Sequence, residues 1–351
     1  MLKGNYNLKS RAVGFDCLKC VCVFLIVCIH QPFLGEIGAY FTALTRIAVP
    51  VFFMITGYFY SVTVRKRHTN NQIIKIIKLT IGANVFYFVW EGCLALLRGN
   101  PSYFEEVSNI KVLIKFLVLN VSPFEGHLWY LSAILYVLII VKLVDRFWNR
   151  KVLWPFIPVL LIGDLCLGKY SLLLFGREFP YTWVRNFLFV GIPYFCLGDL
   201  IYQRRDRIAM IFTKRKNLLL SLIAVIALLN IGERFILVST NVNATRDHYI
   251  CTTFLALLVF ILAQQSKVTD QNKVVDILST IGRKYSMLIY VIHPAFITCF
   301  NLTIRKVVSR IQILNSMYQV IAPMLVFIVA LAFAFAYEKI VRQRRIYLKR
   351  N

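Results

Sequence analysis

The sequence predicts an all-α protein, a polytopic transmembrane helical bundle of about ten spans with both termini in the cytoplasm. Hydrophobic residues make up 59% of the 351 residues and the mean hydropathy is +0.67, which is too apolar for a soluble domain. These residues are gathered into runs that are long enough, or nearly long enough, to cross a bilayer. The basic residues behind the net charge of +25 cluster at the ends of those runs, as topology signals do. The charge therefore indicates a lipid bilayer as partner and no nucleic acid.

The predicted spans follow one another along the whole chain and are separated by short polar segments. They lie at residues 14–34, 41–63, 77–97, 127–144, 152–168, 183–203, 217–233, 249–266, 285–303 and 317–341. With the N-terminus inside, most of the 41 lysines and arginines fall in the predicted inner segments, as expected for cytoplasmic ones. The weakest span is 152–168, because Pro155 and Pro158 are expected to delay or kink its helix.

The segments between the spans are too short to hold a soluble domain. We therefore expect a single membrane domain over residues 1–351, with a core at about 12–341 and a short basic cytoplasmic tail at 342–351. The longest outer stretch contains the segment 110–121, which is too short to cross and is expected to lie along the outer interface or to re-enter. The first apolar run lacks a cleavage site of small residues, so it is expected to remain as an anchor.

The first predicted span carries an acid, a base and an imidazole, namely Asp16, Lys19 and His30. At about 100° per residue, Lys19 and His30 lie about 20° apart around a helix, and Asp16 lies within about 40° of His30. The rise of about 1.5 Å per residue separates Lys19 from His30 by about 16 Å along the axis. Ionisable groups inside a membrane usually face a bundle interior or a water-filled cavity. This stripe therefore predicts a functional path, and His30 has the side chain suited to general-base work near neutral pH.

Three further basic residues have a functional and an ordinary interpretation. Arg46 opens the second span at its outer end, ahead of an aromatic run that reaches Tyr58. It is either an interfacial anchor or a site residue. Lys75 and Lys78 lie one turn apart where the third span leaves the cytoplasm, and they either follow the positive-inside rule or bind anionic phosphates.

The other histidines fall into two groups. His127, close to Trp129 at the outer face, is either part of an aromatic belt or a site residue. His293 precedes a proline inside the ninth span, and since this proline frees a backbone carbonyl, the histidine is either structural or functional. His68 and His248 are expected to be solvated.

The nine cysteines lie within apolar runs or at their edges, and their placement does not suggest a disulfide framework. Cys17, Cys20 and Cys22 point in different directions on one helix, and no second cysteine pair accompanies them. We therefore expect small packing residues here and no metal site.

Together these segments resemble the acyltransferase 3 family of integral-membrane acyltransferases. The likeness is carried by Asp16-x-x-Lys19-x10-His30, Arg46-x-x-x-Pro50-x-Phe52-Phe53-x-x-x-Gly57-Tyr58, His127-Leu128-Trp129-Tyr130, Gly191-Ile192-Pro193-Tyr194-Phe195-x-x-Gly198 and Ser286-x-x-x-Tyr290-x-x-His293-Pro294. It extends from about residue 12 to residue 340, and the order and spacing of the motifs are more specific than any one motif. The chain resembles the membrane module alone, without the esterase-like or racemase domain that some members carry.

The resemblance implies transfer of an acyl group, commonly acetyl from cytoplasmic acetyl-CoA, to a hydroxyl of a glycan, a lipid-linked glycan or a similar molecule of the cell envelope. It implies no bound cofactor, since acetyl-CoA or another acyl-CoA is a co-substrate. The implied location is a cell membrane, the inner or plasma membrane of a bacterium, which the chain crosses several times.

The family's core motif maps onto Lys19 and His30, and its donor-binding Arg-x-x-Arg pair maps onto Lys75 and Lys78. Lysine at these positions keeps the charge but lacks the bidentate fork of arginine. The hypothesis is an O-acetyltransferase, an acyltransferase for groups other than aminoacyl groups, whose catalytic residues are His30, Lys19 and Asp16. His30 acts as general base for the acceptor hydroxyl or accepts the acyl group itself. The residues assigned to the acceptor side or to structure are Arg46, Tyr58, His127, Trp129 and His293.

Two other classes of protein are compatible with a polar stripe in a membrane helix. The first is a transporter or flippase of a small metabolite or lipid-linked sugar, in which the stripe is the permeation path. Broken helices in corresponding halves would favour it, and the sequence shows no such pairing. The second is a membrane-anchored binding partner without catalytic activity. Such a protein would not need three ionisable groups on one membrane span, and these groups are costly there.

Overall fold

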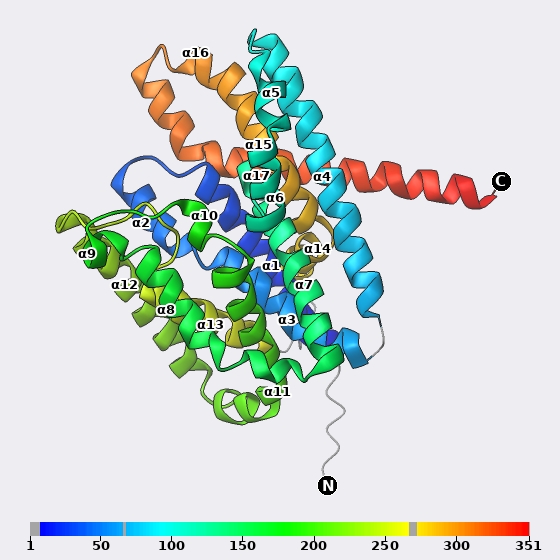
Figure 1. Ribbon diagram of the computed structural model, residues 1–351, viewed down its shortest axis with the longest axis vertical. Coiled ribbons are helices and arrows are strands. Elements are labelled where there is room, and N and C mark those ends of the chain that lie inside the picture. The colour runs from blue at the N-terminus through cyan, green and yellow to red at the C-terminus, as the bar shows by residue number, and fades with distance from the viewer. Residues whose placement is uncertain (1–7, 66–67, 267–271, 351) are drawn as a thin grey trace. The chain divides into compact units, whose positions relative to one another are not determined.

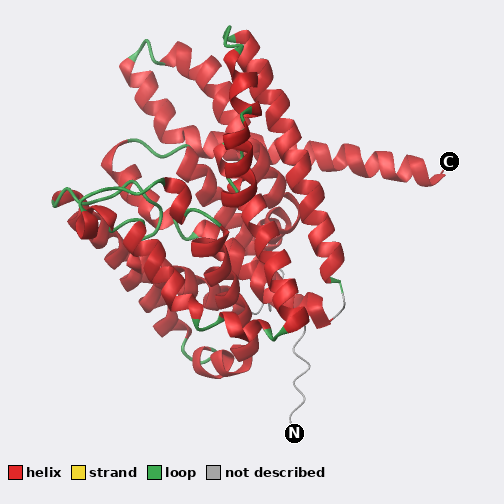
Figure 2. Cartoon of the chain, in the orientation of Figure 1, coloured by secondary structure: helices red, strands yellow, loops and turns green. Residues whose placement is uncertain are grey.

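The structure is a computed structural model that describes residues 8–65, 68–266 and 272–350, and these residues are mostly helical (Figure 2). The chain is 85% helical, and the described ranges contain no strand. Seven helical runs in those ranges are long and apolar enough to cross a membrane. They are Val13–His30, Gly35–Val64, Thr69–Leu97, Gly126–Phe147, Lys216–Ser239, Lys273–Val308 and Gln312–Arg344. The prediction of an all-α, polytopic membrane protein is therefore confirmed.

The chain folds into two compact units, whose α-helices are labelled in Figure 1. Unit 1 comprises Met1–Ala48, Phe212–Ile231 and Phe254–Asn351. Unit 2 comprises Val49–Ile211 and Gly232–Thr253. Each unit is described by itself below.

Unit 1 is organised around α1 (Leu8–His30). The elements that pack against α1 are α2 (Gly35–Thr45), α14 (Lys273–Thr280), the π-helical turn η4 (Ile281–Tyr285), α15 (Ser286–Phe300) and α17 (Gln312–Arg350). Phe15, Val23 and Val27 of α1 are completely buried. The other elements with residues in unit 1 are α12 (Lys216–Ser239), α13 (Ile250–Gln265), η5 (Asn301–Arg305) and α16 (Lys306–Val308). The span that carries the polar stripe is thus the central helix of this unit.

A single glycine allows η4 to approach α1 closely. A Cβ atom at Gly282 would lie 1.7 Å from the carbonyl oxygen of Asp16 and 2.9 Å from the backbone nitrogen of Cys20. Both of these atoms belong to the backbone of α1, so they cannot turn aside as a flexible side chain would. Only glycine fits this contact, which fixes α1 at the level of Asp16.

Unit 2 is organised around α7 (Trp129–Phe147). The elements that pack against α7 are α4 (Thr69–Leu97), the short helices η1 (Gly126–Leu128) and η2 (Arg150–Leu153), and the π-helical turn η3 (Phe187–Gly191). α3 (Ala48–Arg65) approaches α11 (Ile192–Phe212) through Gly57, where a Cβ atom would lie 1.9 Å from the carbonyl oxygen of Phe195. The shorter helices are α5 (Ser102–Ser108), α6 (Ile110–Leu119), α8 (Phe156–Leu167), α9 (Ser171–Phe175) and α10 (Tyr181–Val184).

Three of the ten predicted spans fall outside the seven long runs. The segment 152–168 forms only the 12 residues of α8, whose helix begins after Pro155. The segment 249–266 forms the 16 residues of α13, and η3 precedes α11 within 183–203. The basic segment 342–351 continues α17 as far as Arg350. The count of ten spans and the cytoplasmic termini stay predictions.

Candidate active site

The stripe of α1 begins with an ion pair. Lys19 Nζ lies 2.9 Å from Asp16 Oδ1, one helical turn away. Asp16 is buried, whereas 25% of the Lys19 side chain is exposed. Pairing lowers the cost of placing both charges within a membrane span. Lys19 therefore has a carboxylate as neighbour and does not present an isolated positive charge.

The stripe ends at His30, the last residue of α1, whose side chain is exposed. Its ring lies 5.1 Å from the ring of His293, measured between centroids, with 57° between the ring planes. The structure thus brings together two predicted site residues that lie far apart in the sequence. His30 is the member of this pair that a substrate can reach.

His293 lies in α15 and is completely buried. Its Nδ1 atom is 2.8 Å from the carbonyl oxygen of Tyr290 and 3.2 Å from that of Ile289. Carbonyl oxygens only accept hydrogen bonds, so Nδ1 must carry a proton to donate. At least part of the role of His293 is therefore structural, because its ring satisfies backbone carbonyl groups of α15.

Arg46 is the remaining predicted site residue in unit 1. It follows the last residue of α2 and is half-buried. The residue lies at the junction of α2 and α3, inside the apolar run Gly35–Val64. Its assignment to the acceptor side stays a prediction.

Two predicted residues in unit 2, Tyr58 and Trp129, are buried among aromatic and cationic groups. The Tyr58 ring packs edge-on against Tyr202, with 5.1 Å between the centroids. The guanidinium of Arg185 lies 5.6 Å from the centroid of Trp129, which is within the range of a cation–π contact. Both side chains therefore contribute to packing, whatever else they do.

His127, the third predicted residue with a buried side chain in unit 2, lies in η1 at the start of α7. Its Nδ1 is 3.7 Å from Oε1 of Glu125, and its ring packs edge-on against Tyr87 at 5.1 Å.

Lys75 and Lys78 lie in the first half of α4 and are both exposed. Their three-residue spacing places them on one side of the helix. Within the described ranges, no group of three or more His, Cys, Asp or Glu side chains could hold a metal ion. The assignment of Lys75 and Lys78 to the phosphates of an acyl donor stays a prediction.

Sequence reasoning missed a charged cluster in unit 2. Arg150 donates from Nε to Asp199 at 3.1 Å and from a terminal nitrogen to Asp145 at 3.1 Å, and its other terminal nitrogen donates to Ser61 Oγ at 2.9 Å. Burial opposes the charged guanidinium, but the two carboxylates outweigh it and raise the pKa of Arg150. The cluster joins η2 to α3, α7 and α11. The sequence signal for this cluster was Asp199, because a carboxylate near the end of a predicted membrane span is expected to have a polar or charged partner.

The expectation that His248 is solvated is wrong. His248 is buried, and its Nδ1 lies 2.7 Å from Oδ2 of Asp164, which is also buried. Tyr194 packs on the imidazole with 5.8 Å between the ring centroids. The tertiary contact between α8 and the loop before α13 encloses this histidine, and local sequence does not reveal such a contact.

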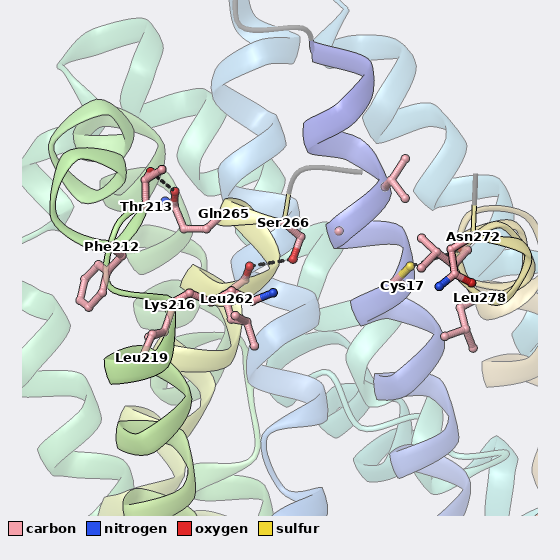
Figure 3. A pocket seen from close by; sticks show the side chains of 13 residues that line it. Cys17, Phe212, Thr213, Lys216, Leu219, Leu262, Gln265, Ser266, Asn272 and Leu278 are labelled. Carbon is pink, nitrogen blue, oxygen red and sulfur yellow. Dashed lines mark hydrogen bonds between the residues drawn. The ribbon is translucent and has the colours of Figure 1, made fainter. Parts of the chain in front are cut away.

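A cavity of about 550 Å³ lies beside α1 in unit 1 (Figure 3). Cys17 and Asn272 lie toward one end of the lining, and Lys216 and Gln265 lie toward the other. At about 100° per residue, Cys17 points about 140° away from His30 around the helix. The cavity therefore occupies a different face of α1 from the stripe.

The fold and the site define a polytopic membrane protein with an accessible imidazole on its central helix in unit 1. The chain belongs to the acyltransferase 3 family, because the family model described as "Acyltransferase domain" matches residues 13–337. The matched range includes both His30 and His293.

Two curated relatives are both described as racemases. The chain is 27% identical over 311 residues to an amino-acid racemase of Enterococcus faecalis, a match that covers 83% of this chain and 42% of the relative. It is 28% identical over 240 residues to a serine/alanine racemase of Enterococcus gallinarum, covering 62% of this chain and 32% of the relative. The chain thus spans less than half the length of either relative. No solved structure matches it.

Proposed function

We propose that the protein transfers an acyl group, with acetyl as the first candidate, from cytoplasmic acyl-CoA to a hydroxyl of a cell-envelope glycan or lipid-linked glycan. The observation that carries this proposal is the exposed imidazole of His30, at the end of the stripe of α1 and beside the ring of His293. A neutral imidazole can remove a hydroxyl proton near neutral pH. The alternative acceptor of the acyl group is the imidazole itself.

In the direct route, the acceptor oxygen attacks the thioester carbonyl while a nitrogen of His30 takes the hydroxyl proton. The new C–O bond forms, the C–S bond breaks, and His30 returns the proton to the leaving sulfur of CoA. In the second route, His30 carries the acyl group before the hydroxyl attacks. Labelled acyl groups trapped on His30 before the acceptor is added would favour the second route.

The exposure of Lys75 and Lys78 supports their assignment to the donor phosphates. Lys19 is less suited to that task, because Asp16 already neutralises it at 2.9 Å. We assign Lys19 and Asp16 instead to the polar path along α1, about 16 Å from His30 along the helix axis. The ammonium group of lysine attracts phosphate as a point charge. It fixes the orientation of the phosphate less well than the planar, forked guanidinium of arginine does.

The buried packing of Tyr58, His127 and Trp129 favours a structural role within unit 2 over direct chemistry. Arg46 is half-buried and is better suited to contact an acceptor. The two enterococcal relatives support a bacterial plasma membrane as the location.

The test is transfer of radiolabel from acetyl-CoA to a glycan fraction by the purified protein in liposomes. His30→Ala is expected to lower the transfer rate by about 100-fold or more, since general-base catalysis contributes about 10²–10⁴-fold. His68→Ala is the matched control, because His68 is an exposed histidine before α4 that the mechanism does not use.

Full transfer by His30→Ala at a normal protein level would overturn the assignment of His30. Absence of transfer with every acyl-CoA, together with flux of a sugar or metabolite into the liposomes, would favour the transporter instead.

A further inference from the structure

We propose that the cavity beside α1 binds an anionic phospholipid. The charged headgroup of this lipid lies at Lys216, and an acyl chain fills the apolar part of the cavity (Figure 3). The cavity belongs to unit 1, because each of its lining residues lies in one of the three segments of that unit. It is a different site from the polar stripe of α1, and the proposal does not depend on the function proposed above.

The cavity lies at the ends of several membrane-spanning helices. Val13 and Lys216 both line it, and each begins one of the long apolar runs. Asn272 also lines it and directly precedes a third run, Lys273–Val308. The end of an apolar run marks the boundary between the hydrocarbon core of a bilayer and its headgroup region. Three runs begin at the cavity, so its polar residues lie at the level of the lipid headgroups.

Deeper in the spans, the lining of the cavity is apolar. Leu219 follows Lys216 by one helical turn in α12 and is almost completely buried. Leu262 precedes Gln265 by one turn near the end of α13, and Val275 lines the cavity from α14. A phosphate ion alone leaves these side chains uncovered, whereas an acyl chain covers them. The volume of about 550 Å³ is within the range of about 300–1,000 Å³ that is usual for ligand pockets.

The charge at the cavity is positive. Lys216 is exposed, and within the part of the chain that the structure describes no carboxylate forms an ion pair with it. Two further exposed cations, Lys214 and Arg215, directly precede it in the sequence. Lys19 differs in this respect, because Asp16 already neutralises it at 2.9 Å. The ammonium group of Lys216 is therefore available to an anion at the membrane boundary.

An anionic phospholipid supplies both of the required groups at the required depths. Its phosphate lies at the level of the headgroups, beside Lys216, and its acyl chains extend into the hydrocarbon core, beside the leucines. A soluble phosphate compound lacks the chains. A neutral phospholipid has the chains, but its own cationic group cancels the charge of its phosphate.

The test uses the Cys17 thiol, which lines the same cavity, as a reporter of occupancy. The full-length protein is reconstituted into vesicles of phosphatidylcholine, with or without phosphatidylglycerol, and treated with N-ethylmaleimide. Mass spectrometry of the peptides gives the alkylation rates of Cys17 and of the exposed Cys93, which lies outside the cavity and corrects for the charge of the vesicles. We expect phosphatidylglycerol to lower the ratio of the two rates by about fivefold.

Three substitutions show whether Lys216 is responsible for this protection. Lys216→Gln removes the charge and is expected to abolish the effect of phosphatidylglycerol, whereas Lys216→Arg keeps the charge and is expected to retain the effect. Lys214→Gln is the matched control, because Lys214 is an exposed cation of the same segment that does not line the cavity. It is expected to behave like the parent. Thermal unfolding in phosphatidylcholine vesicles shows whether each variant is folded.

Equal protection of Cys17 in the parent and in Lys216→Gln would overturn the proposal, as would no protection in the parent. A loss of protection in Lys214→Gln as large as that in Lys216→Gln would mean that the basic segment only attracts the vesicle surface. Inorganic phosphate and acetyl-CoA, each added to phosphatidylcholine vesicles, form the last arm of the test. If either protected Cys17 as well as phosphatidylglycerol does, the cavity would be a site for a soluble anion and the lipid would be excluded.

Discussion

At the scale of single residues, the ion pair in α1 explains how a membrane span tolerates an acid and a base. Asp16 and Lys19 are three residues apart, so a single helical turn brings their charges to 2.9 Å without any help from other elements. The pair is local in sequence, and helical periodicity was sufficient to predict that its members share a face.

Removal of one partner is expected to cost more than removal of both. Lys19→Met leaves the buried carboxylate of Asp16 without its cation, and we expect a loss of up to about 3 kcal/mol of unfolding free energy, moderated by the exposed part of Lys19. The double variant with Asp16→Asn should recover most of that loss. Thermal unfolding in detergent measures each variant.

Lys284→Met is the control for this cycle, since Lys284 lies 3.9 Å from Glu338 and both side chains are 42% exposed. Exposed ion pairs contribute about 1 kcal/mol or less to stability, so this substitution should change the unfolding free energy very little. A double variant that is less stable than Lys19→Met alone would contradict the pairing argument.

The candidate site shows where prediction from sequence ends. The stripe could be predicted because its three residues lie on one helix. The contact between His30 and His293 could not, since it depends on how α15 packs against α1. The burial of His248 was missed for the same reason, because its partner Asp164 comes from a distant helix.

At the scale of elements, the approach of η4 to α1 depends on the absence of a side chain. Gly282→Ala places a Cβ atom 1.7 Å from a carbonyl oxygen, so η4 or α1 must move. We expect a lower melting temperature and reduced acyl transfer, because the displaced backbone belongs to Asp16. Both quantities can be measured on the purified protein.

Gly82→Ala is the matched control, since nothing lies within 4 Å of a Cβ atom at this helical position of α4. Alanine favours a helix over glycine by about 1 kcal/mol, so this variant should be as stable as the parent or more so. Equal stability of the Gly282→Ala and Gly82→Ala variants would mean that the close contact between η4 and α1 does not contribute to stability.

A second element-scale prediction concerns the loop between α9 and α10. Partial burial disfavours a charge on Glu178, but hydrogen bonds from Thr245 and the nearby Arg246 outweigh it and lower the pKa of this carboxyl below 4.5. The contribution of Glu178 to stability is therefore complete above pH 4.5 and declines as the pH falls through the lowered value.

Glu178→Gln should reduce the melting temperature at pH 7, and the difference from the parent should shrink in acid as the parent carboxyl is protonated. Melting curves of both proteins at pH 7 and at about pH 3.5 measure this. A difference that grows in acid would mean that the carboxylate is destabilising where it lies.

At the scale of the whole molecule, length and composition of apolar runs were enough to predict a helical membrane protein. Length and composition were less informative about which of these runs cross the membrane. Pro155 delays α8, which then has only 12 residues, and no local pattern shows how short helices such as α8 and α13 are covered by their neighbours. The division of the chain into two units was not visible in the sequence either, since each unit is assembled from separated segments.

The distribution of basic residues predicts that both termini face the cytoplasm. A small tag at either end should be digested by protease only after the inner face of the membrane is made accessible, for example in inverted vesicles. Digestion of either tag from the outer face of intact cells would contradict this topology.

The cavity beside α1 gives a thiol reagent access to the central helix of unit 1. Cys17 lines it and is partly exposed, whereas Cys20, Cys22 and Cys28 on the same helix are buried. Once the exposed Cys93 and the half-buried Cys166, Cys251 and Cys299 are replaced, a thiol-reactive spectroscopic label should distinguish Cys17 from the other three cysteines of α1, on a face turned well away from His30. The helix thus has a native attachment point at which its motion during turnover can be followed while the reacting groups stay unmodified.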